Sequence, residues 1–411
     1  MARLYNTFEF IGNLFIPRNK DKFHEVNTYD SGWEGHRLNF AVQESKTNSV
    51  FVEMYGGLSK SKVNKVYSFS KGTENNPGGR IEIPWDERLN EDTVDMVADF
   101  RKIIVDFTDD PEVKEKVEEL RYKIRSIEYQ DEKSNDDLEK LKSLKAELKE
   151  LAPDRHEFIH NFDAINFLSE KLEEYKQKKF RVTGSVDYSE SKGRFFRKFM
   201  IESIEIVPND TKNQLRATFD IFFTKDAIDD KDFKKEKKVY VDGYVIGYDS
   251  KAKKDQFFPQ QFVLNAQKLD FENEQHVKRF EFLKNKFDVK GKFAYHLQWI
   301  VNIFRGADTV EFTEKDLTPA QKEAIEFGFN TLDDFKPKGG MLGETTEENR
   351  LVKPVLEKVN DHNDFTSGAV ETEYKDEDLV YVAAINTNTP PAQEEKKEET
   401  KAPVDFDDLF S

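Results

Sequence analysis

A cluster of aromatic and basic residues between positions 188 and 198 has the composition of a surface that binds single-stranded nucleic acid. Such a surface needs aromatic rings on which bases stack and cations that contact phosphates. The cluster supplies both, as Tyr188, Lys192, Arg194, Phe196 and Lys198. On an extended strand, Arg194, Phe196 and Lys198 share one face. Two cations beside one ring suit a groove better than a core, although a purely structural role for Phe196 is the alternative.

Four residues from the first sixty positions are candidate partners for this cluster. They sit in two stretches that alternate polar and apolar residues, 36–42 and 49–55, or just before them. Core packing is the alternative for each of them taken singly. These candidates are Trp33, Arg37, Phe51 and Tyr55.

The elements that must position these residues are mainly strands. Strands are expected at 8–16, 36–42, 49–55, 179–188 and 194–206, and the last two are joined by a short turn as a hairpin. Residues 213–306 repeat the scheme. Strands at 214–223, 238–248 and 257–265 precede a helix near 274–286 and a closing hairpin of 288–295 with 299–304.

Residues 110–151 have a different pattern. Asp110 and Pro111 are typical of a helix start. Apolar residues then recur at alternating spacings of four and three, which predicts an antiparallel helical hairpin with coiled-coil-like seams, ended by Pro153. A packing or self-association arm is the interpretation that this pattern favours. A core helix is expected at about 156–177.

The order of these elements predicts an α+β fold that is mainly β. We expect one or two OB-like barrels, an inserted antiparallel helical hairpin and a disordered acidic C-terminal tail. The predicted domains are 1–207, with the hairpin inserted at 110–151, then 208–335, which ends in a short helix, and an extended tail of 336–411.

The last eight residues, 404–411, place carboxylates around two phenylalanines. A short acidic and aromatic segment has too little apolar surface to fold alone, but it can dock its rings in a pocket while its carboxylates meet Arg or Lys. A solubilising tail that binds nothing is the alternative. The candidate partner-binding residues are Asp405, Phe406, Asp407, Asp408, Leu409 and Phe410.

Three stretches resemble bacterial-type single-stranded DNA-binding proteins. The segment 10–14 is similar to their opening strand, and the helix at 156–177 with the strands after it is similar to their helix and last two strands. The third stretch is the acidic tip, although here Ser411 follows Phe410. The resemblance implies sequence-independent binding and protection of single-stranded DNA, with recruitment of replication and recombination proteins by the tip. The length and the inserted hairpin resemble a phage-encoded member.

Composition limits the other classes of function. The chain of 411 residues has no Cys, which excludes disulfides and thiolate sites, and its net charge is −17. Part of that charge lies at the end, since residues 371–411 contain twelve Asp or Glu and four Lys. No catalytic constellation, metal site or cofactor motif stands out, so we expect a non-enzymatic protein without a cofactor in the cytoplasm of a bacterial or phage-infected cell. The alternative is a scaffold protein that uses the helical arm and the acidic tail and ignores nucleic acid.

Overall fold

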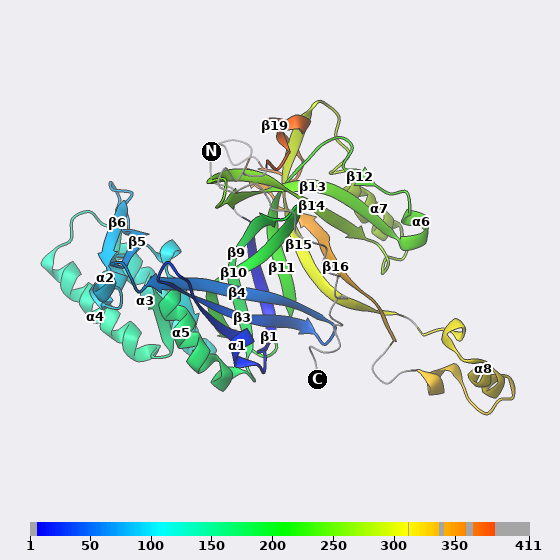
Figure 1. Cartoon of the computed structure of the whole chain (residues 1–411), viewed down its shortest axis with the longest axis horizontal. Coiled ribbons are helices and arrows are strands. Elements are labelled where there is room, and N and C mark those ends of the chain that lie inside the picture. The colour runs from blue at the N-terminus through cyan, green and yellow to red at the C-terminus, as the bar shows by residue number, and fades with distance from the viewer. Residues whose placement is uncertain (1–5, 311, 337–340, 359–364, 383–411) are drawn as a thin grey trace.

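Strands dominate the computed structural model, which describes residues 6–310, 312–336, 341–358 and 365–382. Fifteen strands of these residues belong to one mixed sheet that runs through both halves of the chain (Figure 1). Two groups of five strands within this sheet close into rings, and a lobe inserted in the first ring stands to one side.

The first ring closes through five pairings. β1 pairs with β3 and with β9, β3 pairs with β4, β9 pairs with β10, and β10 returns to β4 in parallel. Side chains alternate between buried and accessible along β9, as expected for strands with one face on a core. The strands are β1 (Thr7–Phe15), β3 (Trp33–Ser45), β4 (Asn48–Ser59), β9 (Lys179–Ser191) and β10 (Arg194–Val207).

The second ring repeats these pairings in the same order. β11 pairs with β13 and β15, β13 pairs with β14, β15 pairs with β16, and β14 meets β16 in parallel. A helix precedes the fourth strand of each ring, α5 (Asn161–Lys171) in the first and α7 (Glu274–Lys284) in the second. The strands are β11 (Gln214–Phe223), β13 (Lys238–Asp249), β14 (Lys254–Asn265), β15 (Phe293–Val310) and β16 (Met341–Pro354).

The two rings share a sheet and a core. β1 pairs with β11 along five residue pairs, from Thr7 with Thr218 to Ile11 with Gln214. One cluster of buried side chains extends from Phe10 in the first ring to Phe262 and Trp299 in the second. The rings are therefore held in a fixed relation by backbone hydrogen bonds and by shared apolar burial.

Residues between β4 and α5 form the inserted lobe (Figure 1, left). The hairpin of β5 and β6 packs its apolar residues in a small cluster of its own, around Val66, Ile83 and Val97. Asp110 caps α3, where it accepts a hydrogen bond from the Glu112 amide, and Ser134 caps α4 in a capping box. The elements are β5 (Lys65–Phe69), β6 (Arg80–Pro84), α2 (Glu91–Met96), β7 (Ile103–Asp106), α3 (Pro111–Glu128), α4 (Asn135–Leu151) and β8 (Arg155–Phe158).

The predicted fold class, α+β with one or two OB-like barrels and an inserted helical hairpin, is wrong. Beyond Val382, the predicted disordered acidic tail lies outside the described residues. The protein is mainly β, and pairing of β1 with β11 joins both halves into one sheet. The helices at 111–128 and 135–151 form, but they belong to the lobe instead of making an arm. Arg121 of α3 forms an ion pair with Glu157 of β8 at 2.9 Å. The seam residues of α3 are buried, whereas α4 buries none.

The predicted closing hairpin of 288–295 with 299–304 is also wrong. β15 continues as one strand to Val310, and its partner is β16, which lies within the range predicted as an extended tail. The intervening residues carry α8 (Pro319–Glu326), which stands away from the body (Figure 1, right). The predicted domain boundaries remain predictions.

The remaining elements are short. They are α1 (Lys20–Phe23), β2 (His24–Thr28), β12 (Ile228–Asp229), α6 (Phe233–Glu236), β17 (Glu357–Lys358), β18 (Phe365–Thr366) and β19 (Val370–Lys375). Within the described part of the chain, no helix combines the length and the hydropathy needed to cross a bilayer.

Candidate nucleic-acid interface

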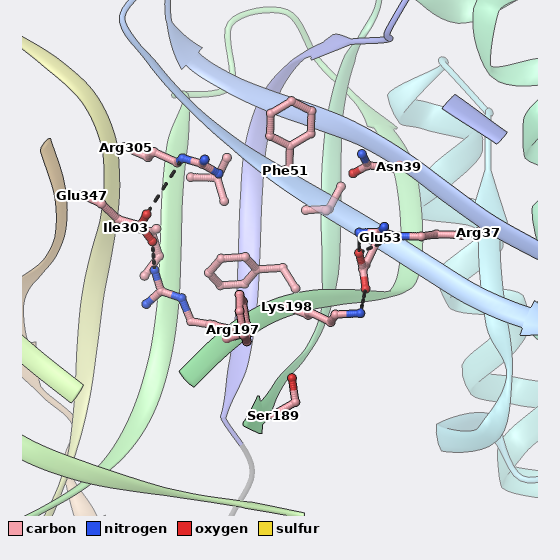
Figure 2. Close-up of a pocket in the computed structure, with 14 residues that line it drawn as sticks. Arg37, Asn39, Phe51, Glu53, Ser189, Arg197, Lys198, Ile303, Arg305 and Glu347 are labelled. Carbon is pink, nitrogen blue, oxygen red and sulfur yellow. Dashed lines mark hydrogen bonds and ion pairs between the residues drawn. The ribbon is translucent and has the colours of Figure 1, made fainter. Parts of the chain in front are cut away.

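A groove of about 520 Å³ lies on the outer face of the first ring, where that ring meets the second (Figure 2). β3, β4 and β10 supply most of its lining, and β15 and β16 supply the far side. It brings together four of the predicted site residues from three strands, namely Arg37, Phe51, Phe196 and Lys198. Its charged lining consists of four cations and two carboxylates, Arg37, Arg197, Lys198, Arg305, Glu53 and Glu347.

Two aromatic rings lie open in this groove. Phe51 of β4 is 41% exposed and Phe196 of β10 is 47% exposed. The parallel pairing of β4 with β10, at Glu53 with Met200, sets the two strands side by side. Half-exposed phenylalanines have unsatisfied apolar surface, and in a groove lined with cations that surface is available for stacking with bases.

Glu53 holds the two cations on one side of the groove. Its side chain is 7% exposed. Arg37 Nε donates a hydrogen bond to Glu53 Oε2 at 2.8 Å, and Lys198 Nζ lies 2.8 Å from Oε1. A buried carboxylate needs such partners, because an unpaired buried charge is costly. Both cations keep exposed surface, 39% for Arg37 and 48% for Lys198, so they also face solvent in the groove.

Glu347 has the same role on the other side. Arg197 Nη2 lies 2.9 Å from Glu347 Oε1, and Arg305 Nε lies 3.9 Å from Oε2 (Figure 2). The Arg305 guanidinium carbon is 6.0 Å from the centre of the Phe51 ring. Glu347 is 57% exposed, so this pairing is screened by water and is weak.

Trp33 and Tyr55 extend the face beyond the groove. Tyr55 lies opposite Arg37 in the pairing of β3 with β4, and it is 42% exposed. Trp33 Nε1 donates a hydrogen bond to Tyr55 Oη at 3.3 Å. The Tyr55 hydroxyl lies over Gly35, where a Cβ would be 2.7 Å from Tyr55 Oη, so a larger residue at position 35 would displace the Tyr55 ring. Aromatic surface thus continues along β4 from Phe51 to Tyr55.

The other three predicted residues lie outside the groove. Tyr188 is 4% exposed in the core, where its ring stacks on Phe258 with centroids 5.5 Å apart, and burial raises the pKa of its hydroxyl. Lys192 forms the turn of the β9–β10 hairpin with Gly193, at φ values of 52° and 77°. Arg194 is exposed at the start of β10. Of the three residues predicted to share one strand face, Phe196 and Lys198 line the groove, and Arg194 does not.

Sequence reasoning missed several lining residues. Glu53 lies in the alternating stretch 49–55 beside Phe51 and Tyr55, and it shares their face because side chains recur every second residue. Arg305 and Glu347 come from β15 and β16, far away in the sequence, and only the pairing of the two rings brings them here. No local pattern could have identified them.

The predicted partner-binding residues Asp405, Phe406, Asp407, Asp408, Leu409 and Phe410 lie outside the described residues. Val382 is the last described residue before them.

Comparison with known proteins identifies no family for this chain. No protein-family model matches it, and no curated protein is similar to it. Among solved structures, it is similar to a deletion mutant of the single-stranded DNA binding protein from Thermus aquaticus. That match covers 88% of this chain and 100% of the other, with 11% sequence identity and a TM-score of 0.28. A likeness this distant does not assign a function.

Proposed function

We propose that this protein binds single-stranded DNA without sequence preference, through the groove on its first ring, and catalyses no reaction. The observation that supports this proposal is the pair of exposed rings, Phe51 and Phe196, set among four cations in one groove. Every base has a face that can stack on an aromatic ring, and every nucleotide has a phosphate. A surface of this kind therefore binds single strands of any sequence.

Phosphates would bind by replacing carboxylates. Each groove cation is already paired, Arg37 and Lys198 with Glu53, and Arg197 and Arg305 with Glu347. A phosphate oxygen offers each cation the same kind of charge-assisted hydrogen bond. Because cations bound to phosphates displace counterions from DNA, the affinity should fall steeply as salt rises.

The acidic tail would act as a tethered competitor and as a docking segment. Twenty-nine residues follow Val382, and at about 3.3 Å per residue such a chain can extend to roughly 95 Å. A tethered competitor has a high effective concentration. When DNA occupies the groove, the tip 404–411 becomes free to recruit replication or recombination proteins.

Tryptophan fluorescence during titration with poly(dT) tests the proposal. Trp33 is the reporter, because its indole lies against Tyr55 at the end of the aromatic face. Trp299 is buried, and Trp85 lies in the inserted lobe, where its ring packs on His160 and Arg88. We expect quenching by poly(dT) that weakens with added salt, and tighter binding at low salt by a chain that ends at Pro403. The Trp33→Phe variant should lose most of the signal while retaining binding in a filter assay.

An absence of binding by either chain at low salt would refute the proposal. The scaffold interpretation would then be the better account of the tail.

A further inference from the structure

Residues 370–382, which we call the strap, lie across the outer face of the second ring (Figure 1, β19). β19 forms the first part of the strap and pairs with β15 at Phe293, Tyr295 and His296. The second part follows an acidic turn to Leu379, which is 1% exposed, and ends at Val382.

The face under the strap is aromatic and belongs to β11, β13 and β14. The Tyr374 ring packs edge-on against Phe222 and Phe257, with centroids 5.9 and 5.2 Å away. Leu379 is buried in the same cluster, which also contacts Tyr244 and Ile246. The strap therefore supplies the side chains that take this face out of water.

The first ring has the corresponding strands, and an aromatic side chain on β1 stays exposed. In both rings the first strand pairs with the second strand and the fourth, so β11, β13 and β14 correspond to β1, β3 and β4. Phe15 of β1, paired with Ala41 of β3, is 39% exposed. Phe222 of β11, paired with Tyr244 of β13, is 2% exposed. Phe15 is thus open to solvent, whereas Phe222 is buried under the strap.

The strap has the chemical pattern of a bound single strand. Its residues alternate, so Thr372 and Tyr374 are partly buried against the ring while Glu371, Glu373 and Lys375 are exposed. It contains five carboxylates and one lysine. An aromatic group on the protein face with negative charge toward solvent is the arrangement of a stacked base and its phosphate.

The end of the strap is hydrogen-bonded to β13 and β14 near the turn between them. Tyr381 Oη donates a hydrogen bond to Asp249 Oδ2 at 2.5 Å, and the Val382 amide donates one to Gln256 Oε1 at 2.9 Å. Asp249 also accepts from the amides of Lys251 and Ala252, so it fixes the turn between β13 and β14. Lys251 of that turn forms an ion pair with Glu190 of β9 at 3.7 Å.

Pairing and packing both hold the strap. β19 pairs with β15 over three register positions, with an irregularity between Phe293 and Tyr295. The Tyr381 ring also packs against Phe195 and Phe258, with centroids 5.1 Å away in each case. Local segments open at a lower free energy than the whole domain. DNA that displaces the strap must therefore replace this packing with contacts of its own.

We propose that the strap is a built-in competitor, which covers a second single-strand-binding face on β11, β13 and β14 and leaves when DNA binds there. This inference rests on the proposed function, since it takes single-stranded DNA as the ligand. It assigns a regulatory role to a segment distinct from the acidic tip.

A disulfide that locks the strap tests this inference in the full chain. Phe293 and Lys375 are register partners on β15 and β19, both exposed, and antiparallel partners lie about 4.5–5.5 Å apart between Cα atoms, which a disulfide can span. The native chain has no Cys, so the variant Phe293→Cys with Lys375→Cys contains a single possible intramolecular bond. The two single variants are the controls, and non-reducing gels exclude linked dimers.

The measured quantity is the number of nucleotides occluded per chain at saturation with poly(dT). We expect about twofold more nucleotides in the reduced double variant than in the oxidised one, because the locked strap leaves only the first ring available. Loosening the strap with Leu379→Ala should lower the DNA concentration at which the larger number is reached.

The outcomes separate this inference from the proposed function. Tight binding with the same number of occluded nucleotides in both redox states would refute the role of the strap but not the proposed binding in the groove. Binding in neither state would refute the proposed function and the strap together.

Discussion

Removing both exposed rings from the groove should abolish most of the affinity for single-stranded DNA. Stacking on an aromatic ring contributes about 1–3 kcal/mol per base. Phe51→Ala with Phe196→Ala therefore costs at least about 2 kcal/mol, which is roughly a 30-fold rise in Kd. The fold should persist, because both rings are nearly half exposed and their truncation opens no closed cavity.

The assay is poly(dT) titration at fixed salt, with far-UV circular dichroism as the check on folding. A matched control is Phe282→Ala, because Phe282 is 51% exposed and has a cation, Lys286 Nζ, 4.3 Å from its ring centre, but it lies on α7 away from the groove. The control should bind like the unmodified protein. A folded double variant whose Kd stays within twofold of the unmodified protein would show that these rings do not stack with bases.

Three further predictions follow from the charged residues. Glu347→Gln should tighten binding by roughly fivefold at low salt, about 1 kcal/mol, because it removes the screened carboxylate partner of Arg305 and Arg197, although Arg197 keeps its hydrogen bond to Asn349. Unchanged or weaker binding would contradict the exchange of carboxylate for phosphate. Lys198→Ala should weaken binding and lower the slope of log K against log salt by about 0.7, measured by salt titration, and an unchanged slope would remove Lys198 from the interface. Burial alone would raise the pKa of Glu157, but Lys102, Arg121 and Arg155 outweigh it and lower that pKa from 4.5 to about 2. Its ionised form therefore stabilises the fold above pH 4.5 by roughly 3 kcal/mol, and this contribution is lost as the pH falls towards 2. Glu157→Gln should lower Tm at pH 7, and its Tm should fall less than that of the unmodified protein between pH 4.5 and 2.

Local patterns predicted most strands, because burial on one face leaves a signal of period two in the sequence. The stretches at 36–42, 49–55, 194–206 and 238–248 all lie within strands of the structure. The same logic placed Phe196 among the site residues, since it shares a strand face with Arg194 and Lys198, and it placed Phe51 there as a candidate from a neighbouring strand. Tyr188, also a predicted site residue, lies instead on the buried face of its strand, against Phe258.

Non-local pairing is what the sequence could not show. The fusion of two rings depends on β1 meeting β11, whose residues are about two hundred positions apart. The pairing of β15 with β16 likewise joins strands on either side of the segment that carries α8. A short hairpin fitted the local sequence pattern equally well. The apolar spacing in α3 correctly predicted a helix. It does not show whether that helix packs only on another helix or on the rest of the inserted lobe.

A net charge of −17 opposes binding to DNA, but several carboxylates lie where they pair with cations or cover a ring. Glu53 and Glu347 neutralise the groove cations while the groove is empty, and the strap lays its carboxylates over the second ring. In the proposed function, each of these carboxylates would give up its place to a phosphate, so binding would exchange one anion for another. Duplex DNA offers phosphates but no exposed bases to stack on Phe51 and Phe196, so it supplies only half of what displacement requires. Duplex DNA should therefore compete poorly with poly(dT) at equal phosphate concentration, and strong competition by duplex would mean that charge alone governs the groove.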